Sequence, residues 1–242
     1  MNIEAVMNIA AIRRALPGRR IDYYPTIDST MRAAAGLPVG SVVLAGEQTA
    51  GQGRHGHTWH SEPGAGIYCS IVLNPAPVLT LAIGLAAVEA ITEVTGAVCD
   101  LRWPNDLMLG GKKCAGILVQ LVDGLAIAGI GINVNHASFP PELAEEATSL
   151  RLQTGQQRSR EDIVIALIPA VDRLTALSQE EILDLFTHAS SYASGRRVAV
   201  HQPDGDIHGV TAGLDPAGFL KVRQDNGTHT LILAGGVRAA RS

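Results

Sequence analysis

A glycine-rich segment at residues 51–56 combines three glycines with Arg54, and Trp59 follows it closely. The spacing G-x-G-x-x-G is typical of loops that bind the pyrophosphate of a dinucleotide between a strand and a helix. A strand is expected at residues 41–46, but Pro63 and the glycines after it predict turns where that helix would have to begin. We therefore expect a long flexible loop that carries one arginine and ends on an aromatic residue.

A polar pair, Asn105 and Asp106, follows Pro104 at the end of a predicted strand. A carboxylate in this place could help to hold Mg²⁺, and the amide could bind phosphate-bound water or the metal shell. The same residues also suit an Asn-Asp turn between two strands. Spacing alone favours the turn.

A lysine, Lys113, is expected near the start of a strand, and Gly116 after it lets a ligand approach the backbone closely. An ammonium group in this place can bind a phosphate or a carboxylate. Taken alone, a solvated pair of lysines on a hairpin turn is the simpler interpretation. The chain lacks the pattern G-x-x-x-x-G-K-[ST], which excludes a P-loop nucleotide site.

Three histidines, His55, His57 and His60, alternate along the glycine-rich loop and raise the question of a metal. A structural zinc site needs a fourth Cys or His close by, and the nearest cysteine, Cys69, lies within a predicted strand. The sequence therefore favours a loop without zinc. A serine hydrolase is not expected either, because the chain has no G-x-S-x-G elbow.

The composition bounds the class of protein. The 242 residues are 46% hydrophobic, which is ample for a buried core, and the net charge of −4 argues against an extended nucleic-acid-binding surface. The three cysteines include no C-x-x-C pair, and the N-terminus is unlike a signal peptide. The most apolar helical window, residues 78–88, is too short to span a bilayer. We expect a soluble protein of the reducing cytoplasm, with no membrane association.

The first part of the chain predicts an α+β domain, because its strands cluster rather than alternating strictly with helices. Asp123 and Gly124 separate two apolar runs and predict a hairpin. Ser159 is the expected N-cap of a helical stretch over residues 160–188. Further helices are predicted over residues 3–16, 31–35 and 79–94, and strands over residues 21–24, 41–46, 67–73, 99–103, 114–122 and 125–134.

The pattern changes near residue 195, where short apolar runs alternate with turns rich in Pro, Asp and Gly. Short strands with tight turns over so few residues predict a small barrel. The strands are expected at residues 196–200, 207–214, 219–222 and 231–233. We therefore divide the chain into a domain of residues 1–190 and a C-terminal domain of residues 191–242.

The order of the motifs is more specific than any one of them. The loop G-x-G-R-x-G-x-x-W, then W-P-N-D, K-x-A-G-I-L and G-I-G-I-N-V-N, resembles the biotin protein ligase family over nearly the whole chain. Asp28-Ser29-Thr30 near the beginning and Gly235-Gly236-Val237 near the end extend the resemblance. It implies a class II synthetase-like mixed sheet with flanking helices, followed by an SH3-like β-barrel.

The resemblance also implies an activity. Members of this family use MgATP to activate biotin as biotinyl-5′-AMP, and then pass the biotinyl group to one lysine of a biotin carboxyl carrier protein. Arg54 and Lys113 are the expected catalytic residues, because cationic groups must hold two anions together in line. Trp59 would pack on the ligand and exclude water, so that the loop acts as a lid over a hydrolysable intermediate.

Further site residues follow from the same resemblance, position by position. The residues expected to bind biotin are Ser29, Thr30, Gln48, Gly51, Arg54, His55, Gly56, Trp59, Lys113 and Gly116. The residues expected to bind ATP and its phosphates are Gly53, Arg54, Trp59, Asn105, Asp106 and Asn133, with Asp106 as a ligand of Mg²⁺.

The chain departs from the family pattern at Gln52 and His57, where members often have arginine. We expect this less basic loop to weaken ATP binding more than biotin binding. The 28 residues before Ser29 are too few for the winged helix-turn-helix of some members, so DNA binding is not expected. Relatives often dimerise through the sheet, but no pattern in this chain indicates a homodimer. The alternatives are a lipoate-protein ligase and a non-catalytic, ligase-like binding module.

Overall fold

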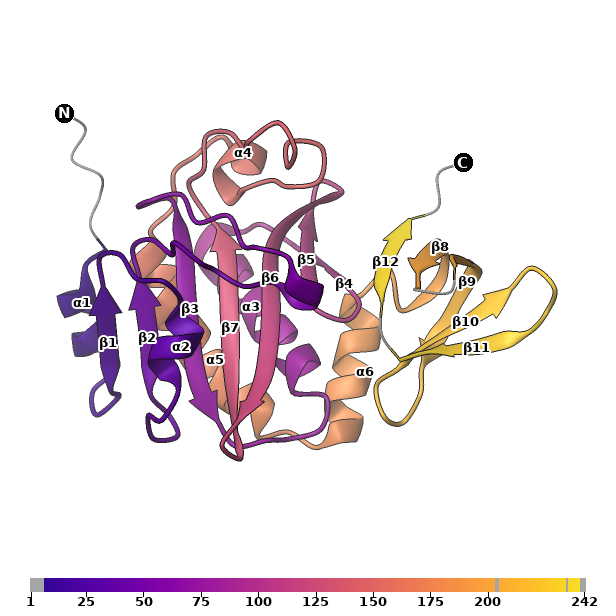
Figure 1. The fold of residues 1–242 in the computed structure, drawn as a ribbon, viewed down its shortest axis with the longest axis horizontal. Coiled ribbons are helices and arrows are strands. Elements are labelled where there is room, and N and C mark those ends of the chain that lie inside the picture. The colour runs from indigo at the N-terminus through magenta and orange to yellow at the C-terminus, as the bar shows by residue number, and fades with distance from the viewer. Residues whose placement is uncertain (1–6, 203–204, 234, 240–242) are drawn as a thin grey trace.

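Seven strands form one mixed sheet in the order β1-β2-β3-β7-β6-β5-β4 (Figure 1). The structure, a computed structural model, describes residues 7–202, 205–233 and 235–239. Strands β1 and β2 are parallel, and the other neighbouring pairs are antiparallel. The strands are β1 (Ile21–Tyr24), β2 (Val42–Ala45), β3 (Gly66–Leu73), β4 (Asp100–Arg102), β5 (Asp106–Leu109), β6 (Lys112–Val122) and β7 (Leu125–Asn133).

Helices cover the two faces of this sheet unequally. In Figure 1, α3, α5 and α6 lie behind the sheet, and the short α2 lies in front of it. Contacts of α3 and α5 with each other and with the strands form the main core, whereas α2 packs on β2, β3 and β7. The helices are α1 (Ile9–Ala15), α2 (Thr30–Ala34), α3 (Leu79–Thr95), α4 (Leu150–Thr154), α5 (Arg160–Thr175) and α6 (Gln179–Ala189), with a 3₁₀ turn η1 (Arg54–Gly56).

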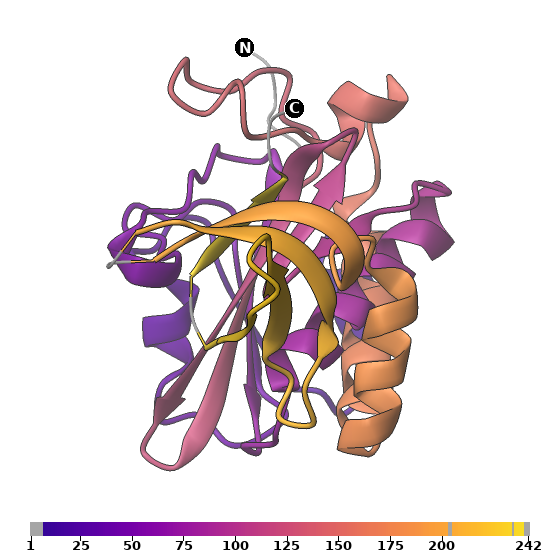
Figure 2. The ribbon, with the colours of Figure 1, turned by 90° about the vertical axis from the view of Figure 1, so that its right-hand side faces the viewer.

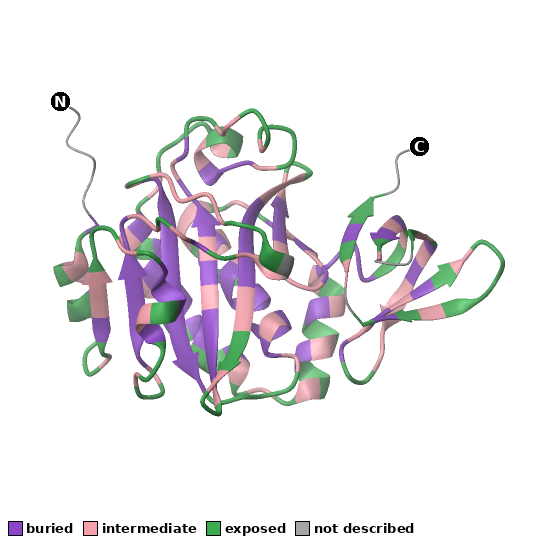
Figure 3. Ribbon diagram, viewed as in Figure 1, coloured by how far each residue is buried: buried purple, intermediate pink, exposed green. Residues whose placement is uncertain are grey.

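Strand β3 is buried on both faces, as Figure 3 shows for its whole length. Ile67, Cys69 and Ile71 join the core under the helices, whereas Val72 packs with Met31 of α2. Alternate residues of a strand point to opposite faces, so Tyr68 and Ser70 point to the front with Val72. The front of the sheet is therefore apolar under α2 and polar at the centre.

Five antiparallel strands form a second sheet in the order β11-β10-β9-β8-β12. Figure 2 views this sheet in front of the larger one. A buried hydrogen bond from Trp103 Nε1 to the Gly218 carbonyl (2.9 Å) connects the first sheet to the turn between β9 and β10. Ser190 Oγ, at the end of α6, donates to the Leu101 carbonyl of β4 (2.5 Å). The strands are β8 (Ser194–His201), β9 (Ile207–Leu214), β10 (Leu220–Gln224), β11 (His229–Ile232) and β12 (Gly236–Ala239).

Most of the predicted elements are present, so the predicted α+β class is confirmed. The Asp123-Gly124 turn has φ of +49° and +80°, which the right-handed twist of a two-residue hairpin requires. Ser159 accepts from the Asp162 amide as the expected N-cap of α5. The predicted helix over residues 160–188 is wrong in one respect, because it is two helices. Ser178 begins α6 with a capping box that it shares with Glu181.

Four short elements were not predicted, namely η1, β5, α4 and β12. The predicted helix over residues 3–16 begins at Ile9, and residues 1–6 lie outside the described part. Within the described residues, no helix is both long enough and apolar enough to cross a bilayer.

Candidate functional site

Glycines on β6 and β7 form the floor of a cavity on the front of the sheet. Gly116 pairs with Gly131, and Gly129 pairs with Leu118. A Cβ atom at Gly129 would lie 2.8 Å from Met31 Sδ, and one at Gly131 would overlap the indole of Trp59. The G-I-G pattern of β7 thus leaves the floor bare where other side chains must approach it.

The cavity brings together nine of the predicted site residues: Ser29, Thr30, Gln48, Gly53, Arg54, Trp59, Asn105, Lys113 and Gly116. They come from segments that are far apart in the sequence, namely the beginning of α2, the start of the loop after β2, the glycine-rich loop, the turn before β5, and β6. Residues that line the cavity but were not predicted are Met31, Gln52, Cys69, Ile117, Leu118, Gly129, Ile130 and Gly131. The alternation of small and branched residues along β7 was the available signal for the last three.

One wall of the cavity is a chain of polar side chains. The Thr30 amide and hydroxyl both donate to Gln48 Oε1, at 2.8 and 3.0 Å, and the Thr30 hydroxyl lies 2.8 Å from Ser70 Oγ. Both of these hydrogen bonds go to Oε1 of Gln48, so its Nε2 group remains able to donate to a ligand. Ser29 Oγ is buried and has no hydrogen-bond partner among the described residues. A hydroxyl in this position is free to bind a polar ligand in the cavity.

The glycine-rich loop folds as a small hairpin over the cavity. The Gly53 amide donates to the His57 carbonyl at 2.7 Å, and the Trp59 amide donates to the Gly51 carbonyl at 2.9 Å. Gly56, with φ of +79°, closes the turn. The loop thus makes its own backbone hydrogen bonds in this structure; its predicted flexibility stays a prediction.

The Trp59 side chain lies on the bare glycine floor. A Cβ atom at Gly116 would come within 3.1 Å of Trp59 Cζ3, and Lys113 Nζ lies 5.5 Å from the centre of the Trp59 ring. The cavity that remains measures about 40 Å³, which is room for a few waters at most. A ligand of ordinary cofactor size therefore requires this indole to move aside.

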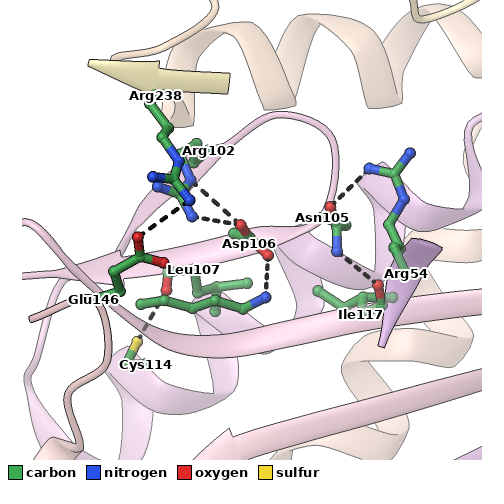
Figure 4. Close-up of polar contacts among 10 residues, drawn as sticks. Arg54, Arg102, Asn105, Asp106, Leu107, Cys114, Ile117, Glu146 and Arg238 are labelled. Carbon is green, nitrogen blue, oxygen red and sulfur yellow. Dashed lines mark hydrogen bonds and ion pairs between the residues drawn. The ribbon is translucent and has the colours of Figure 1, made fainter. Parts of the chain in front are cut away.

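Two cations hold the Asp106 carboxylate. Lys113 Nζ lies 2.5 Å from Asp106 Oδ1, and Arg102 donates to Oδ2 at 2.7 Å (Figure 4). Burial by itself would raise the pKa of Asp106, but Lys113 and Arg102 together outweigh it and lower the pKa below its ordinary value. The turn that was the alternative interpretation is present as well, because residues 103–105 turn between β4 and β5.

Arg54 reaches the opposite side of the cavity. Its Nη1 donates to Asn105 Oδ1 at 3.0 Å, and Asn105 Nδ2 donates to the Ile117 carbonyl at 3.0 Å (Figure 4). Burial lowers the pKa of Arg54, opposed by the charge of Asp106. A guanidinium of such high ordinary pKa stays charged. The site therefore presents two cations, one on the loop and one on β6.

Several predicted residues lie apart from the cavity. Gly51, Gly56 and Asp106 do not line it, and Asn133 is buried with its Nδ2 donating 3.0 Å to the Thr148 carbonyl. Asn133 therefore connects β7 to the segment before α4. The side chain of His55 lies outside the described part.

Comparison with known proteins identifies the family of this chain. The bifunctional ligase/repressor BirA of Bacillus subtilis is 32% identical over 92% of this chain and 75% of its own length. The chain belongs to the biotin protein ligase family. Models of the biotin/lipoate A/B protein ligase family and of the biotin protein ligase C-terminal domain match residues 18–136 and 193–237 of this family member.

Two further biotin ligases resemble the chain closely. The biotin–[acetyl-CoA-carboxylase] ligase of Mycobacterium tuberculosis is 33% identical over 86% of this chain and 82% of its own length. The solved structure of the Aquifex aeolicus biotin protein ligase in complex with biotin and ATP has a TM-score of 0.82 and 30% identity, covering 92% of this chain and 99% of that one. The predicted family is therefore confirmed.

Proposed function

We propose that this protein is an ATP-dependent ligase that activates biotin as biotinyl-5′-AMP and transfers the biotinyl group to a lysine of a biotin carboxyl carrier protein. The observation that carries the proposal is the meeting of Arg54 and Lys113 at one cavity whose other wall is the polar chain from Ser29 to Gln48. Biotin has a carboxylate at one end and a ureido ring at the other, so it needs both kinds of wall.

The ureido ring would bind to the polar wall. Ser29 Oγ is buried without a partner among the described residues, and the Gln48 amide nitrogen can donate, so both can bind the ring. Thr30 keeps Gln48 in this orientation. The bare backbone at Gly116 supports the ring on the floor, and Trp59 would cover it once the indole has moved from that floor. We therefore propose Ser29, Thr30, Gln48 and Gly116 as biotin-binding residues.

The chemical step joins two anions. An oxygen of the biotin carboxylate attacks the α-phosphorus of ATP, the bond to the β-phosphate breaks, and pyrophosphate leaves. Lys113 would hold the attacking carboxylate and balance the charge that grows on the α-phosphate, while Arg54 and the Gly53 backbone would bind the phosphate from the loop. In the second step, the lysine amine of the acceptor attacks the acyl carbon and AMP leaves.

Mg²⁺ enters as part of the MgATP substrate. The donor set of this chain does not favour a separate ion at Asp106, because Lys113 and Arg102 already pair with its two oxygens. An ion at that position would have to displace one of them. We therefore propose that Asp106 acts mainly as a positioning residue for Lys113, and that Asn105 holds Arg54. Asn133 would affect the binding of adenine only indirectly, because its side chain is bonded to the segment before α4.

The acceptor would approach from the side of the C-terminal sheet. A second cleft of about 300 Å³ shares Arg54, Ile117 and Leu118 with the cavity and extends to Trp103 and Phe219. An acceptor domain seated there would bring its lysine to the acyl carbon. We further propose the division into domains 1–190 and 191–242, an SH3-like closure of the C-terminal strands, and a cytoplasmic location where MgATP is abundant.

The test is ATP–pyrophosphate exchange with biotin or lipoate as the acid. We expect exchange with biotin that is lost in Lys113→Ala, and none with lipoate, because the relatives are named biotin ligases. Exchange with lipoate alone would assign the second enzyme class. Exchange with neither acid would reject both, and would leave a non-catalytic binding module.

A further inference from the structure

A second cluster of side chains lies beside the loop and outside the cavity. His60 and Glu62 follow Trp59 in the chain, and His136 follows the end of β7. One potential ligand atom from each residue lies within 4.8 Å of the other two. In the part of the chain that the structure describes, no other three His, Cys, Asp or Glu side chains meet in this way. The predicted histidine set was different, since it joined His60 to His55 and His57.

His136 carries a lone pair that lacks a partner. The Tyr68 hydroxyl donates to the Glu62 carbonyl at 2.8 Å, so toward His136 Nε2, at 3.5 Å, it can only accept. Nε2 then carries the proton, and Nδ1 carries the lone pair. Nδ1 is buried and has no hydrogen-bond partner among the described residues, and the residue is 0% exposed. A buried, unpaired acceptor is costly unless a ligand satisfies it.

Aromatic rings pack around the His136 imidazole. The Phe139 ring stacks on His136 with its centre 5.1 Å away, and the His60 ring lies 6.0 Å from that of His136. The Phe139 ring thus covers one face of the His136 ring. Glu62 supplies a negative charge that would offset the repulsion between a bound cation and the positive charge of Arg160.

We propose that His60, Glu62 and His136 form a binding site for Zn²⁺ or a similar divalent transition-metal ion. Two imidazoles and one carboxylate are an established ligand set for zinc, and imidazole selects this class of ion over Mg²⁺. Tetrahedral bonds of about 2.1 Å place neighbouring ligand atoms roughly 3.4 Å apart, so the present spacing needs only a small closure. His60 and Glu62 are half-buried and can move to make it.

A metal here would fix the end of the loop to the sheet. His60 is the neighbour of Trp59, and His136 lies just beyond β7, on which the Trp59 indole rests. The ion would therefore limit how far the hairpin can open without touching biotin, ATP or the residues proposed to bind them. The site goes beyond the proposed function and does not depend on it.

The experiment uses the full chain after removal of bound metal with a chelator. Zn²⁺ is titrated in competition with a chromophoric chelator, and Co²⁺ is added in parallel as an absorbing probe. We expect one Zn²⁺ per chain and visible bands of four-coordinate Co²⁺. Loss of one ligand in His60→Ala or Glu62→Gln should weaken Zn²⁺ binding at least about tenfold. His57→Ala, on the same loop, is the matched control and should bind as the unchanged chain does.

Three results would overturn the proposal. These are absence of Zn²⁺ binding at micromolar concentration, unchanged affinity in both ligand variants, and an equal loss in His57→Ala. Replacement of His136 is avoided, because that side chain is fully buried and its loss would disturb the core. No biotin or ATP is added, so an inactive ligase would still give a clear answer about the metal.

Discussion

Lys113 Nζ lies 2.5 Å from Asp106 Oδ1, and the same carboxylate accepts from Arg102 at 2.7 Å. The β5–β6 pairing sets this contact, because Asp106 is opposite Gly116, three residues along β6 from Lys113. Lys113, which we propose as catalytic, is therefore paired with a buried carboxylate that also pairs with Arg102. An anionic substrate that enters the cavity must either share Lys113 with Asp106 or replace Asp106 as the partner of Lys113.

Removing the Asp106 charge should impair the chemical step more than binding. In Asp106→Asn the lysine loses its anchor, and we expect kcat for pyrophosphate exchange to fall about tenfold, or about 1.4 kcal/mol, with a smaller change in the KM for biotin. Asp22→Asn, whose carboxylate pairs with Arg20 away from the site, is the control. A rise in the biotin KM at unchanged kcat would contradict the positioning role.

The same carboxylate predicts a pH dependence of stability. The pKa of Asp106 is lower in the folded protein than in the unfolded chain, so its contribution is present above the unfolded pKa and is lost as the pH falls through the folded one. Asp106→Asn removes this term. Urea unfolding between pH 7 and pH 3 should therefore show a smaller loss of unfolding free energy in the variant. Equal losses in the two proteins would be incompatible with the lowered pKa.

The less basic loop is predicted to weaken ATP binding more than biotin binding. Gln52 lines the cavity, so Gln52→Arg adds a cation beside the phosphates and should lower the KM for ATP about fivefold, a gain of about 1 kcal/mol. The KM for biotin should change less. His57 does not line the cavity, so His57→Arg should have the smaller effect on ATP. An unchanged ATP KM in Gln52→Arg would count against this account.

The bare floor at Gly131 predicts a steric effect. A methyl group there overlaps the Trp59 indole and projects into the cavity that biotin would fill, so Gly131→Ala should displace the indole and, by occupying that space, raise the KM for biotin about tenfold. Tryptophan fluorescence would report the displacement before any ligand is added. Gly236→Ala, where an added Cβ meets nothing within 4 Å, is the matched control. Unchanged fluorescence and KM would show that Trp59 does not rest on this floor in solution.

The contact between the two sheets predicts a loss of stability. Trp103→Phe leaves the buried Gly218 carbonyl without its donor, which should lower the unfolding free energy by about 1–3 kcal/mol. Trp59→Phe removes an indole nitrogen that has no hydrogen-bond partner among the described residues, and should cost less. Guanidinium unfolding measures both. Equal losses would mean that the Trp103 hydrogen bond adds nothing to stability.

Local patterns in the sequence determined most of the elements. The Asp123-Gly124 hairpin and the Ser159 cap depend on residues that are close in the chain, so their identity alone predicts them. Motif order likewise determined the family and placed Arg54 and Lys113 at the site. The break between α5 and α6 was missed because the apolar period continues across it, while the Ser178–Glu181 capping box acts only once the helix begins there.

Only the tertiary structure decided which side chains meet. The register of β5, β6 and β7 brings Lys113 to Asp106 and lays Trp59 on Gly131, and neither pairing follows from spacing along the chain. The same is true of His60 and His136, which lie on different segments and meet because the chain after the glycine-rich loop runs beside the chain after β7, where the Asn135 amide donates to the Ala65 carbonyl. The physical reason is that such contacts depend on strand register and burial, which only the packing of the whole domain determines.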